Sequence, residues 1–292
     1  MTLSAAALRA FFTAHPAAIA AELTAVRGSS PREAGAFMLV SATGQIGTIG
    51  GGALEYLVID RARQVLRSGE PGDDLDIPLG PEIGQCCGGR VDVSLRRLDE
   101  AAVARLIGRI EAEVAARPHI FLFGAGHVGR ALAHALAPLP VHVHVVDTRP
   151  AELSGLPDLV ATHAVPMPEA MVRRAPPGSS YAILTHDHAL DFLIGAEALQ
   201  RRDAPYVGMV GSKTKRARFR SWYAAEGHPV GELERLVLPI GGKAFPAGTG
   251  DKRPEVIAAL AAAEIMVHTL GREVELGIRP VTAMQSGAVV GH

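Results

Sequence analysis

Aromatic residues and cysteines are both scarce in this chain of 292 residues, since aromatics make up 4% of it and cysteine occurs twice. Few rings are available for bases to stack on, and the net charge of −1 gives no attraction to phosphate backbones, so we expect no nucleic-acid binding. The cysteines, Cys86 and Cys87, are adjacent, and adjacent cysteines do not form an ordinary disulfide. A reducing compartment fits them best, and we expect a cytoplasmic protein.

The sequence also lacks a run of about 18 uncharged apolar residues, so we expect no helix that spans a membrane. Its first residues, MTLSAAALRAFFTAHPAA, have no basic segment followed by a long apolar one, and we expect no secretory signal. With 48% hydrophobic and 20% charged residues, the composition is that of a globular protein with a sizeable core.

The length predicts about two domains. An amphipathic helix, strands and a hairpin come first, and from Ile120 to Leu270 strands and helices alternate, which predicts a parallel sheet with helices on both faces. The expected fold class is α/β, an N-terminal α+β domain followed by a Rossmann-like parallel sheet domain. The expected boundaries are 1–98 for the first domain, 99–117 for a connecting helix, 118–270 for the Rossmann-like domain and 271–292 for a tail.

A glycine motif organises the second domain. The apolar run from Ile120 to Phe123 leads into GAGHVG at 124–129, followed by a helical pattern and a second apolar strand that ends at Asp147. This order of strand, G-x-G-x-x-G loop, helix, strand and acidic residue is typical of a dinucleotide-binding unit. In such a unit Gly124 makes the tight turn, Gly126 lets the backbone approach a phosphate, and Gly129 lets the helix pack closely on the sheet. The helix N-terminus attracts an anion, and we expect His127 to point toward a phosphate bound there.

Asp147 lies 23 residues after Gly124, near the distance expected for an acid that holds a ribose hydroxyl. The alternative is that the glycines only tighten a strand-to-helix turn and bind nothing. A second glycine run, Gly50 to Gly52, also stands between a strand and a helix, and there the tight turn without a ligand is the favoured interpretation.

Loops that follow parallel strands gather at one edge of the sheet. Two such loops carry candidate groups. His186, Asp187 and His188, with Asp191 one turn on, are typical either of a metal or acid/base cluster or of a helix cap in which Asp187 accepts N–H groups. Ser212 and Lys213 follow a later strand, where Lys213 is placed to hold a phosphate. The basic residues after Lys215 are better explained as a solvated helix face, and Arg27 and Arg32 are weaker phosphate candidates.

Cys86 and Cys87 sit in a glycine loop, GQCCGG, rather than on an apolar strand or helix where structural cysteines are usually buried. This favours a reactive or metal-facing thiol over a thiol of no consequence. The C-x-x-C spacing of structural zinc sites is absent from the sequence.

Taken together, the segments resemble the xanthine dehydrogenase accessory proteins of the XdhC/CoxI family, and they run from Val26 to Ile265 in the family's order. The matching segments are VRGSSPREAGAFMLV, GTIGGGALE, GQCCGGRVDV, FGAGHVG with VVDTRP, LTHDHALD, YVGMVGSKTKRARF and LPIGGKAFPAGTGDKRPEVIAALAAAEI.

The resemblance implies a chaperone for the molybdenum cofactor, molybdopterin, which has a dithiolene-held molybdenum and a phosphate tail. Such proteins protect the cofactor, support its sulfuration with a cysteine desulfurase, and pass it to the molybdenum subunit of apo-xanthine dehydrogenase. Carried onto this chain, the resemblance makes Cys86 and Cys87 the cofactor-facing thiols, and soft thiolates suit such a metal. The other cofactor-binding candidates are Gly124, Gly126, His127, Gly129, Asp147, His186, His188, Ser212 and Lys213, and we expect a homodimer.

One question stays open at this point. Asp147 predicts a ribose, whereas the plain pterin cofactor has none, so the loop holds either the cofactor's phosphate or a separate nucleotide. Two other functions remain as alternatives: an NAD(P)-dependent oxidoreductase, in which His186 or His188 relays a proton, and a nucleotide-sensing regulatory module. A complete catalytic set is not visible in the sequence, which favours an accessory protein over an enzyme.

Overall fold

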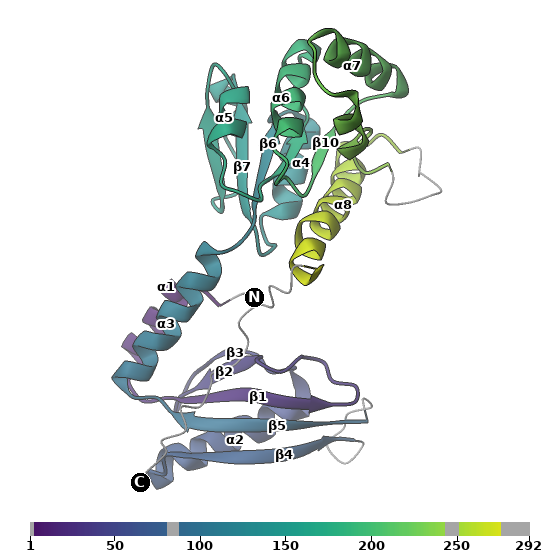
Figure 1. Cartoon of the computed structure of the whole chain (residues 1–292). Helices are drawn as coiled ribbons and strands as arrows, with labels where there is room; N and C mark the ends of the chain where they lie inside the picture. The colour runs from purple at the N-terminus through teal and green to yellow at the C-terminus, as the bar shows by residue number, and fades with distance from the viewer. Residues whose placement is uncertain (1–2, 81–87, 243–250, 276–292) are drawn as a thin grey trace, which may run out of the picture. The chain divides into compact units, whose positions relative to one another are not determined.

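A computed structural model of the chain describes residues 3–80, 88–242 and 251–275. The chain divides into two compact units between Ala116 and Arg117 (Figure 1). Each unit has its own sheet and its own hydrophobic core.

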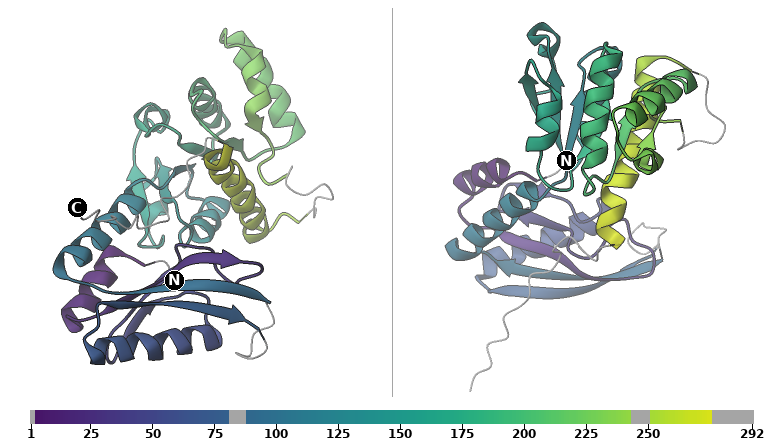
Figure 2. Two further views of the ribbon diagram at one scale, coloured as in Figure 1. Left: turned by 60° about the horizontal axis from the view of Figure 1, so that its bottom comes forward. Right: turned by 45° about the horizontal axis from the view of Figure 1, so that its top comes forward.

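The first unit is built on a five-stranded antiparallel sheet in the order β3-β2-β1-β5-β4. Helix α2 lies along one face (Figure 2, left), where Leu54, Val58 and Val65 pack against the inward residues of the strands. Helices α1 and α3 pack on each other and on Leu39 of the opposite face. The elements are α1 (Ala5–Ala14), β1 (Ile19–Arg27), β2 (Phe37–Val40), β3 (Gln45–Gly47), α2 (Gly52–Ser68), β4 (Gly72–Leu79), β5 (Gly89–Arg97) and α3 (Glu100–Ala115).

Local sequence explains most of these elements. Ser4 and Asp99 accept backbone N–H groups in the first turns of α1 and α3, as N-cap side chains do. Strand β5 buries Val91, Val93 and Leu95, every second residue. Helix α3, expected to be a connector, contributes Leu106 and Ile110 to the core that it shares with α1.

The second unit has a six-stranded parallel sheet in the order β11-β10-β9-β6-β7-β8, which confirms the Rossmann-like expectation. Helices α4 and α8 cover one face, and α5, α6 and α7 cover the other. The elements are β6 (His119–Phe123), α4 (His127–Leu136), β7 (His142–Asp147), η2 (Pro150–Leu153), β8 (Val160–Ala164), α5 (Glu169–Arg174), β9 (Ser180–Ile183), α6 (His188–Gln200), β10 (Val207–Met209), α7 (Lys213–Ala225), η3 (Val230–Arg235), β11 (Leu236–Val237) and α8 (Pro254–Glu275).

Helix α8 begins at Pro254, as expected for a proline in the first turn, but it continues past Leu270 to Glu275. Its segment Pro254–Gly271 is long and apolar enough to cross a membrane by length and composition alone. Its buried residues, including Ala261 and Ile265, belong to the core that α8 shares with α4, and they make up about a third of the segment.

The strand order places a topological switch point between β6 and β9, because the chain leaves β6 toward β7 on one side and returns to β9 on the other. Ligands of open parallel sheets bind at this point, outside the carboxyl ends of the strands.

Candidate functional site

A cleft of about 300 Å³ lies at the switch point of the second unit. Its lining comes from the segments that follow β6, β7 and β9, which sequence reasoning expected to gather there. The lining residues are Ala125, Gly126, His127, Arg130, Arg149, Glu152, Leu184, Thr185 and His186. We call this the switch-point cleft.

Three glycines of the 124–129 loop have different reasons to be glycine. Gly124 has a φ of +113°, and a Cβ there would lie 2.4 Å from the carbonyl oxygen of Leu184, so the tight-turn role is confirmed. A Cβ at Gly129 would lie 1.9 Å from the carbonyl oxygen of Gly124, which confirms its close-packing role. A Cβ at Gly126, by contrast, would meet no described atom within 4 Å. Packing of the described protein therefore does not require glycine at position 126.

Helix α4 starts at this glycine, with Gly126 as its N-cap, and no described side chain caps it. Its first N–H groups and the positive end of its dipole belong to the cleft's glycine segment. Arg130 stands one turn further on, fixed by hydrogen bonds from its guanidinium to the carbonyls of Ser154 at 2.6 Å and Glu152 at 2.7 Å. With Arg149 and the exposed His127, these groups suit an anion.

Asp147, the expected ribose ligand, is only 4% exposed and is occupied by protein donors. One carboxylate oxygen accepts the Ala125 N–H at 2.8 Å and Arg149 Nη2 at 3.1 Å, and the other accepts the Arg149 N–H at 2.9 Å and Nε at 3.0 Å. Burial raises the pKa of Asp147, but the hydrogen bonds from Arg149 and Ala125 outweigh it and leave the pKa lowered. Asp147 thus ties the glycine loop to Arg149, which lines the cleft.

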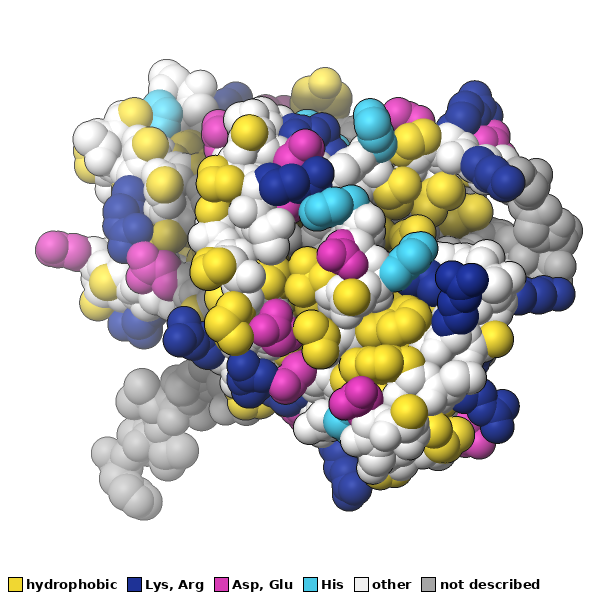
Figure 3. Space-filling view, turned by 90° about the horizontal axis from the view of Figure 1, so that it is seen from above, with side chains coloured by type: hydrophobic (Ala, Val, Ile, Leu, Met, Phe, Trp, Pro, Cys, Tyr) yellow, Lys and Arg dark blue, Asp and Glu magenta, His cyan; other side chains and the backbone are white. Residues whose placement is uncertain are grey.

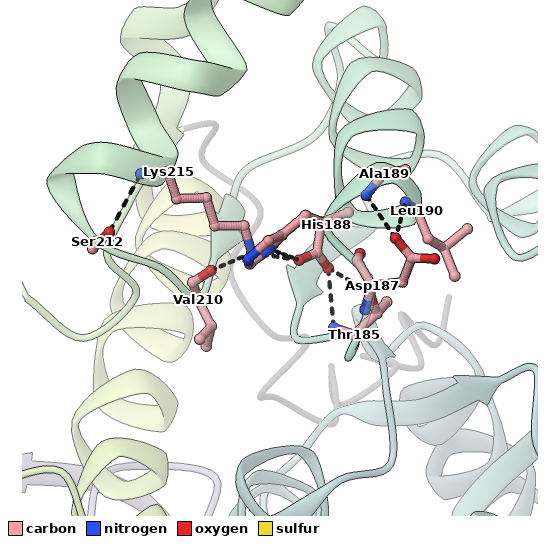
Figure 4. A network of polar contacts seen from close by, with 9 residues as sticks. Thr185, Asp187, His188, Ala189, Leu190, Val210, Ser212 and Lys215 are labelled. Carbon is pink, nitrogen blue, oxygen red and sulfur yellow. Dashed lines mark hydrogen bonds and ion pairs between the residues drawn. The ribbon is translucent and has the colours of Figure 1, made fainter.

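In the segment from Thr185 to Asp191, the structure confirms the helix-cap interpretation of Asp187 (Figure 4). Asp187 accepts the N–H groups of Ala189 at 2.7 Å and Leu190 at 3.4 Å, so it caps α6. His186 lines the cleft, whereas the His188 side chain is 73% exposed. Across the ranges that the structure describes, no group of three or more His, Cys, Asp or Glu is placed to hold a metal ion.

Asp191 is fully buried and holds the cleft's edge together. Its Oδ1 accepts the N–H of Thr185 at 3.0 Å and the hydroxyl of Thr185 at 2.7 Å, while Oδ2 pairs with Lys215. Lys215 Nζ also donates to the carbonyl of Val210 at 2.7 Å (Figure 4). One carboxylate therefore connects the loop after β9 to the loop after β10.

Sequence reasoning singled out Lys213 and overlooked Lys215. Ser212 caps α7 by accepting the N–H of Lys215 at 3.3 Å, and Lys213 is exposed. Lys215 is buried with Phe219 and Tyr223, four and eight residues further along the helix. That spacing was the signal in the sequence, because a lysine in register with buried aromatics on a helix faces the core.

Two of the weaker candidates of the first unit, the second glycine run and Arg27, are occupied by protein groups. Glu55 accepts the N–H groups of Ile49 at 3.0 Å and Gly51 at 2.9 Å, so the chain's own carboxylate fills the second glycine run, and the tight-turn interpretation holds. Arg27 forms ion pairs with Asp92 at 2.6 Å and Asp76 at 3.1 Å.

Cys86 and Cys87 lie outside the described residues, and their assignment stays a prediction. The glycines that follow them are described. A Cβ at Gly89 would lie 2.1 Å from the carbonyl oxygen of Ser29, and Gly88 forms a bridge with Ser29. The end of the cysteine loop therefore packs directly on the Arg27–Ser29 segment.

Charge is mixed rather than one-sided on the face shown in Figure 3, where basic, acidic, histidine and apolar side chains alternate. This agrees with the near-zero net charge. Attraction of an anion to the cleft would therefore depend on the individual charged groups that line it rather than on the overall charge of the protein.

Comparison with known proteins agrees with this geometry. Residues 120–265 match the model of the XdhC Rossmann domain, and residues 13–76 match that of the XdhC and CoxI family. A crystal structure described as a xanthine dehydrogenase from Bacillus halodurans has the same fold, with a TM-score of 0.76 at 19% identity over 92% of this chain and 97% of that one.

The uncharacterized protein YqeB of Escherichia coli strain K12 is 29% identical over 257 residues. The match covers 84% of this chain but only 42% of YqeB, so the chain spans less than half the length of that relative. The family models, by contrast, together reach from residue 13 to residue 265, across both units. The chain belongs to the XdhC and CoxI family of xanthine dehydrogenase accessory proteins.

Proposed function

We propose that this protein acts in the maturation of xanthine dehydrogenase as a chaperone for the molybdenum cofactor. In this role it binds and protects the cofactor, supports its sulfuration together with a cysteine desulfurase, and inserts it into the molybdenum subunit of apo-xanthine dehydrogenase. The bound molybdenum supplies the redox chemistry of the mature enzyme, so the chaperone itself needs only to hold, shield and release it. Family membership supports the general role.

The single observation that carries the binding part of the proposal is Gly126. A loop glycine that packing does not require, at the N-terminus of a helix that no described side chain caps, is what close approach of a phosphate demands. Arg130 and Arg149 line the same cleft and supply positive charge for the phosphate tail.

Among the described residues, those that line the switch-point cleft suit the phosphate of the cofactor. A cleft of about 300 Å³ lies at the lower end of the range for small-molecule sites and has room for part of a pterin beside that phosphate. Independently of this cleft, the proposal keeps Cys86 and Cys87 as soft thiolate ligands for molybdenum, as the family resemblance implies.

Asp147 favours the pterin phosphate over a nucleotide. A ribose-binding acid must offer carboxylate oxygens to two hydroxyl groups, and both oxygens of Asp147 already accept two hydrogen bonds each. A nicotinamide-dependent oxidoreductase would need a free acceptor at this position, which Asp147 does not offer while Arg149 and Ala125 bind it.

The proposal is tested on the purified, untagged protein by heat denaturation, oxidation of the released material, pterin fluorescence, and elemental measurement of molybdenum. We expect the oxidised pterin and molybdenum in comparable amounts. Protein expressed with an active cofactor pathway that releases neither would overturn the proposal, and release of a nicotinamide or flavin instead would establish the oxidoreductase alternative.

A further inference from the structure

Three imidazoles form a hydrogen-bonded row across strands β6, β7 and β8 of the second unit, none of them lining the switch-point cleft. His119 Nδ1 lies 2.9 Å from His144 Nε2, and His144 Nδ1 lies 3.1 Å from His163 Nε2. We call these three residues the histidine row.

Strand register explains how the row forms. His119 is opposite His142, Phe121 is opposite His144, and His163 is opposite Val146. Alternate residues of a strand share a face, and residues paired between parallel neighbours point the same way, so these side chains lie on one face of the sheet. The ring of Phe121 stacks on the imidazole of His144, with 4.4 Å between the two ring centroids, and holds that imidazole in place.

The row consists of neutral imidazoles near neutral pH. Burial lowers the pKa of His144 to about 4 and also lowers the pKa values of His119 and His163. Neutral imidazole is the form that binds zinc, copper and nickel. All three residues are partly exposed.

The nitrogen separations suit a shared metal ion almost as well as a hydrogen bond. Two ligands at the usual Zn–N distance on a tetrahedral ion stand about 3.3 Å apart, a few tenths of an ångström more than the 2.9 Å between His119 and His144. Both rings would have to rotate, and the two nitrogens separate slightly, for both lone pairs to point at one ion.

The third member completes the arrangement. When His144 Nε2 is a ligand, the ring proton sits on Nδ1, which then donates to His163 Nε2. Metal-bound histidines regularly donate their second ring N–H to such an acceptor, which fixes the tautomer and the ring orientation.

We propose that His119 and His144 bind one divalent transition-metal ion of the zinc, copper and nickel class, oriented by the hydrogen bond from His144 to His163. Since no three metal-binding groups converge among the described residues, water would complete the coordination. Such a centre is separate from the cofactor, and it stands whether or not the proposed function does.

The test is titration of untagged full-length protein with Ni²⁺ or Zn²⁺ alone, followed by calorimetry. To exclude the thiols as ligands, the same titration is made with the Cys86→Ser, Cys87→Ser variant. We expect one ion per chain in both proteins. His119→Gln keeps a hydrogen-bonding partner for His144 but removes a ligand, and we expect it to weaken binding at least about tenfold.

His163→Leu removes only the acceptor, and we expect a loss of about 10–100-fold, while His163→Gln restores most of the affinity because glutamine still accepts. His134→Gln, on the exposed side of α4, is the matched control and should bind like the parent. An affinity of His119→Gln equal to that of the parent, or binding that disappears with the two cysteines, would overturn the proposal. Cu²⁺ added to the parent should also show nitrogen hyperfine coupling in its electron paramagnetic resonance spectrum, and a spectrum without it would contradict imidazole ligation.

Discussion

Lys215 on α7 and Asp191 on α6 form a buried ion pair that joins the loops following β9 and β10. Asp191 is 0% exposed and Lys215 is 8% exposed, so neither charge has water to replace a lost partner. Loss of one member leaves an unpaired buried charge, which is far more costly than the pair itself is stabilising.

We predict that Lys215→Met lowers the free energy of unfolding by about 3–5 kcal/mol. Lys213→Met, two residues away and exposed, should change it by no more than about 0.5 kcal/mol. The double variant Asp191→Asn, Lys215→Met should be more stable than Lys215→Met alone, because the unpaired charge is gone. Urea denaturation of the four proteins measures this, and equal losses in the two lysine variants would contradict a structural role for the pair.

The glycine loop gives a prediction that separates binding from folding. Gly126→Val should cost no more than about 1 kcal/mol, because its side chain enters open space and only the N-cap preference is lost. It should nevertheless abolish retention of pterin and molybdenum, because the side chain fills the place of the phosphate.

Two controls bracket the Gly126→Val result. Gly108→Val, in α3 of the first unit where a Cβ also meets no described atom, should keep the cofactor. Gly129→Ala should destabilise the protein, because its Cβ would collide with the carbonyl of Gly124. Full cofactor content in folded Gly126→Val would show that the loop holds no phosphate.

The occupied carboxylate of Asp147 predicts that millimolar NAD or NADP will not raise the melting temperature of the protein. The motif alone predicts instead that Asp147 holds a ribose hydroxyl. Differential scanning fluorimetry with each nucleotide is sufficient, and inorganic phosphate is the positive comparison. A clear shift with NAD would mean that Arg149 gives way and releases Asp147 for a ribose.

The histidine row predicts acid sensitivity. The pKa of His144 is about 4 in the folded protein, against an ordinary value of about 6.5 when unfolded, because burial and the neighbouring imidazoles disfavour the charged form. The unfolded chain therefore binds more protons, and the contribution of His144 to stability is complete above pH about 6.5 and falls as the pH drops toward 4.

Urea denaturation between pH about 7 and about 5 measures this decline. His144→Phe, which keeps a ring beside Phe121, should flatten it, and His134→Gln should not. A parent protein whose stability is constant over that interval would contradict the prediction.

The cysteine prediction concerns the molybdenum end of the cofactor. We expect Cys86→Ser, Cys87→Ser to hold less molybdenum per chain and to deliver less sulfurated cofactor to apo-xanthine dehydrogenase, because serine replaces a soft thiolate with a hard, neutral oxygen. The free energy of unfolding should move by no more than about 0.5 kcal/mol, as for loop substitutions generally. The single variants should be unequal, since neighbours in a loop rarely face the same ligand, and a double variant equal to the parent in both assays would refute the role.

Local signals predicted much of the fold. The glycine spacing, the cap residues Ser4 and Asp187, and the alternation of β5 all act within a few residues, and each was readable from the chain. Asp147 and Arg149 are also close in sequence, yet their mutual binding was not predicted, because a motif names the acid without showing which donors reach it.

Contacts between distant segments were beyond the sequence. Lys215 meets Asp191 only because α6 and α7 follow neighbouring strands, and His119 meets His144 and His163 only in one order of β6, β7 and β8. Periodicity can indicate which side of its element Lys215 or His144 faces, although neither residue was singled out from it. It did not show what stands opposite them.

Helices α2 and α4 both have a glycine as their N-cap, Gly51 and Gly126, and their N-termini can be compared within one molecule. At α2 the chain's own Glu55 accepts the amides of Ile49 and Gly51. At α4 Asp147 accepts the amide of Ala125, but no described side chain caps the first turn of the helix. The N-terminus of α2 therefore has a permanent carboxylate of the protein beside it, whereas the first turn of α4 remains available to an anion from solution. An anion can be added to Glu55→Ala and to the parent, and the gain in the free energy of unfolding measured for each. The difference would compare the stabilisation by the protein's own carboxylate with that by an anion from solution.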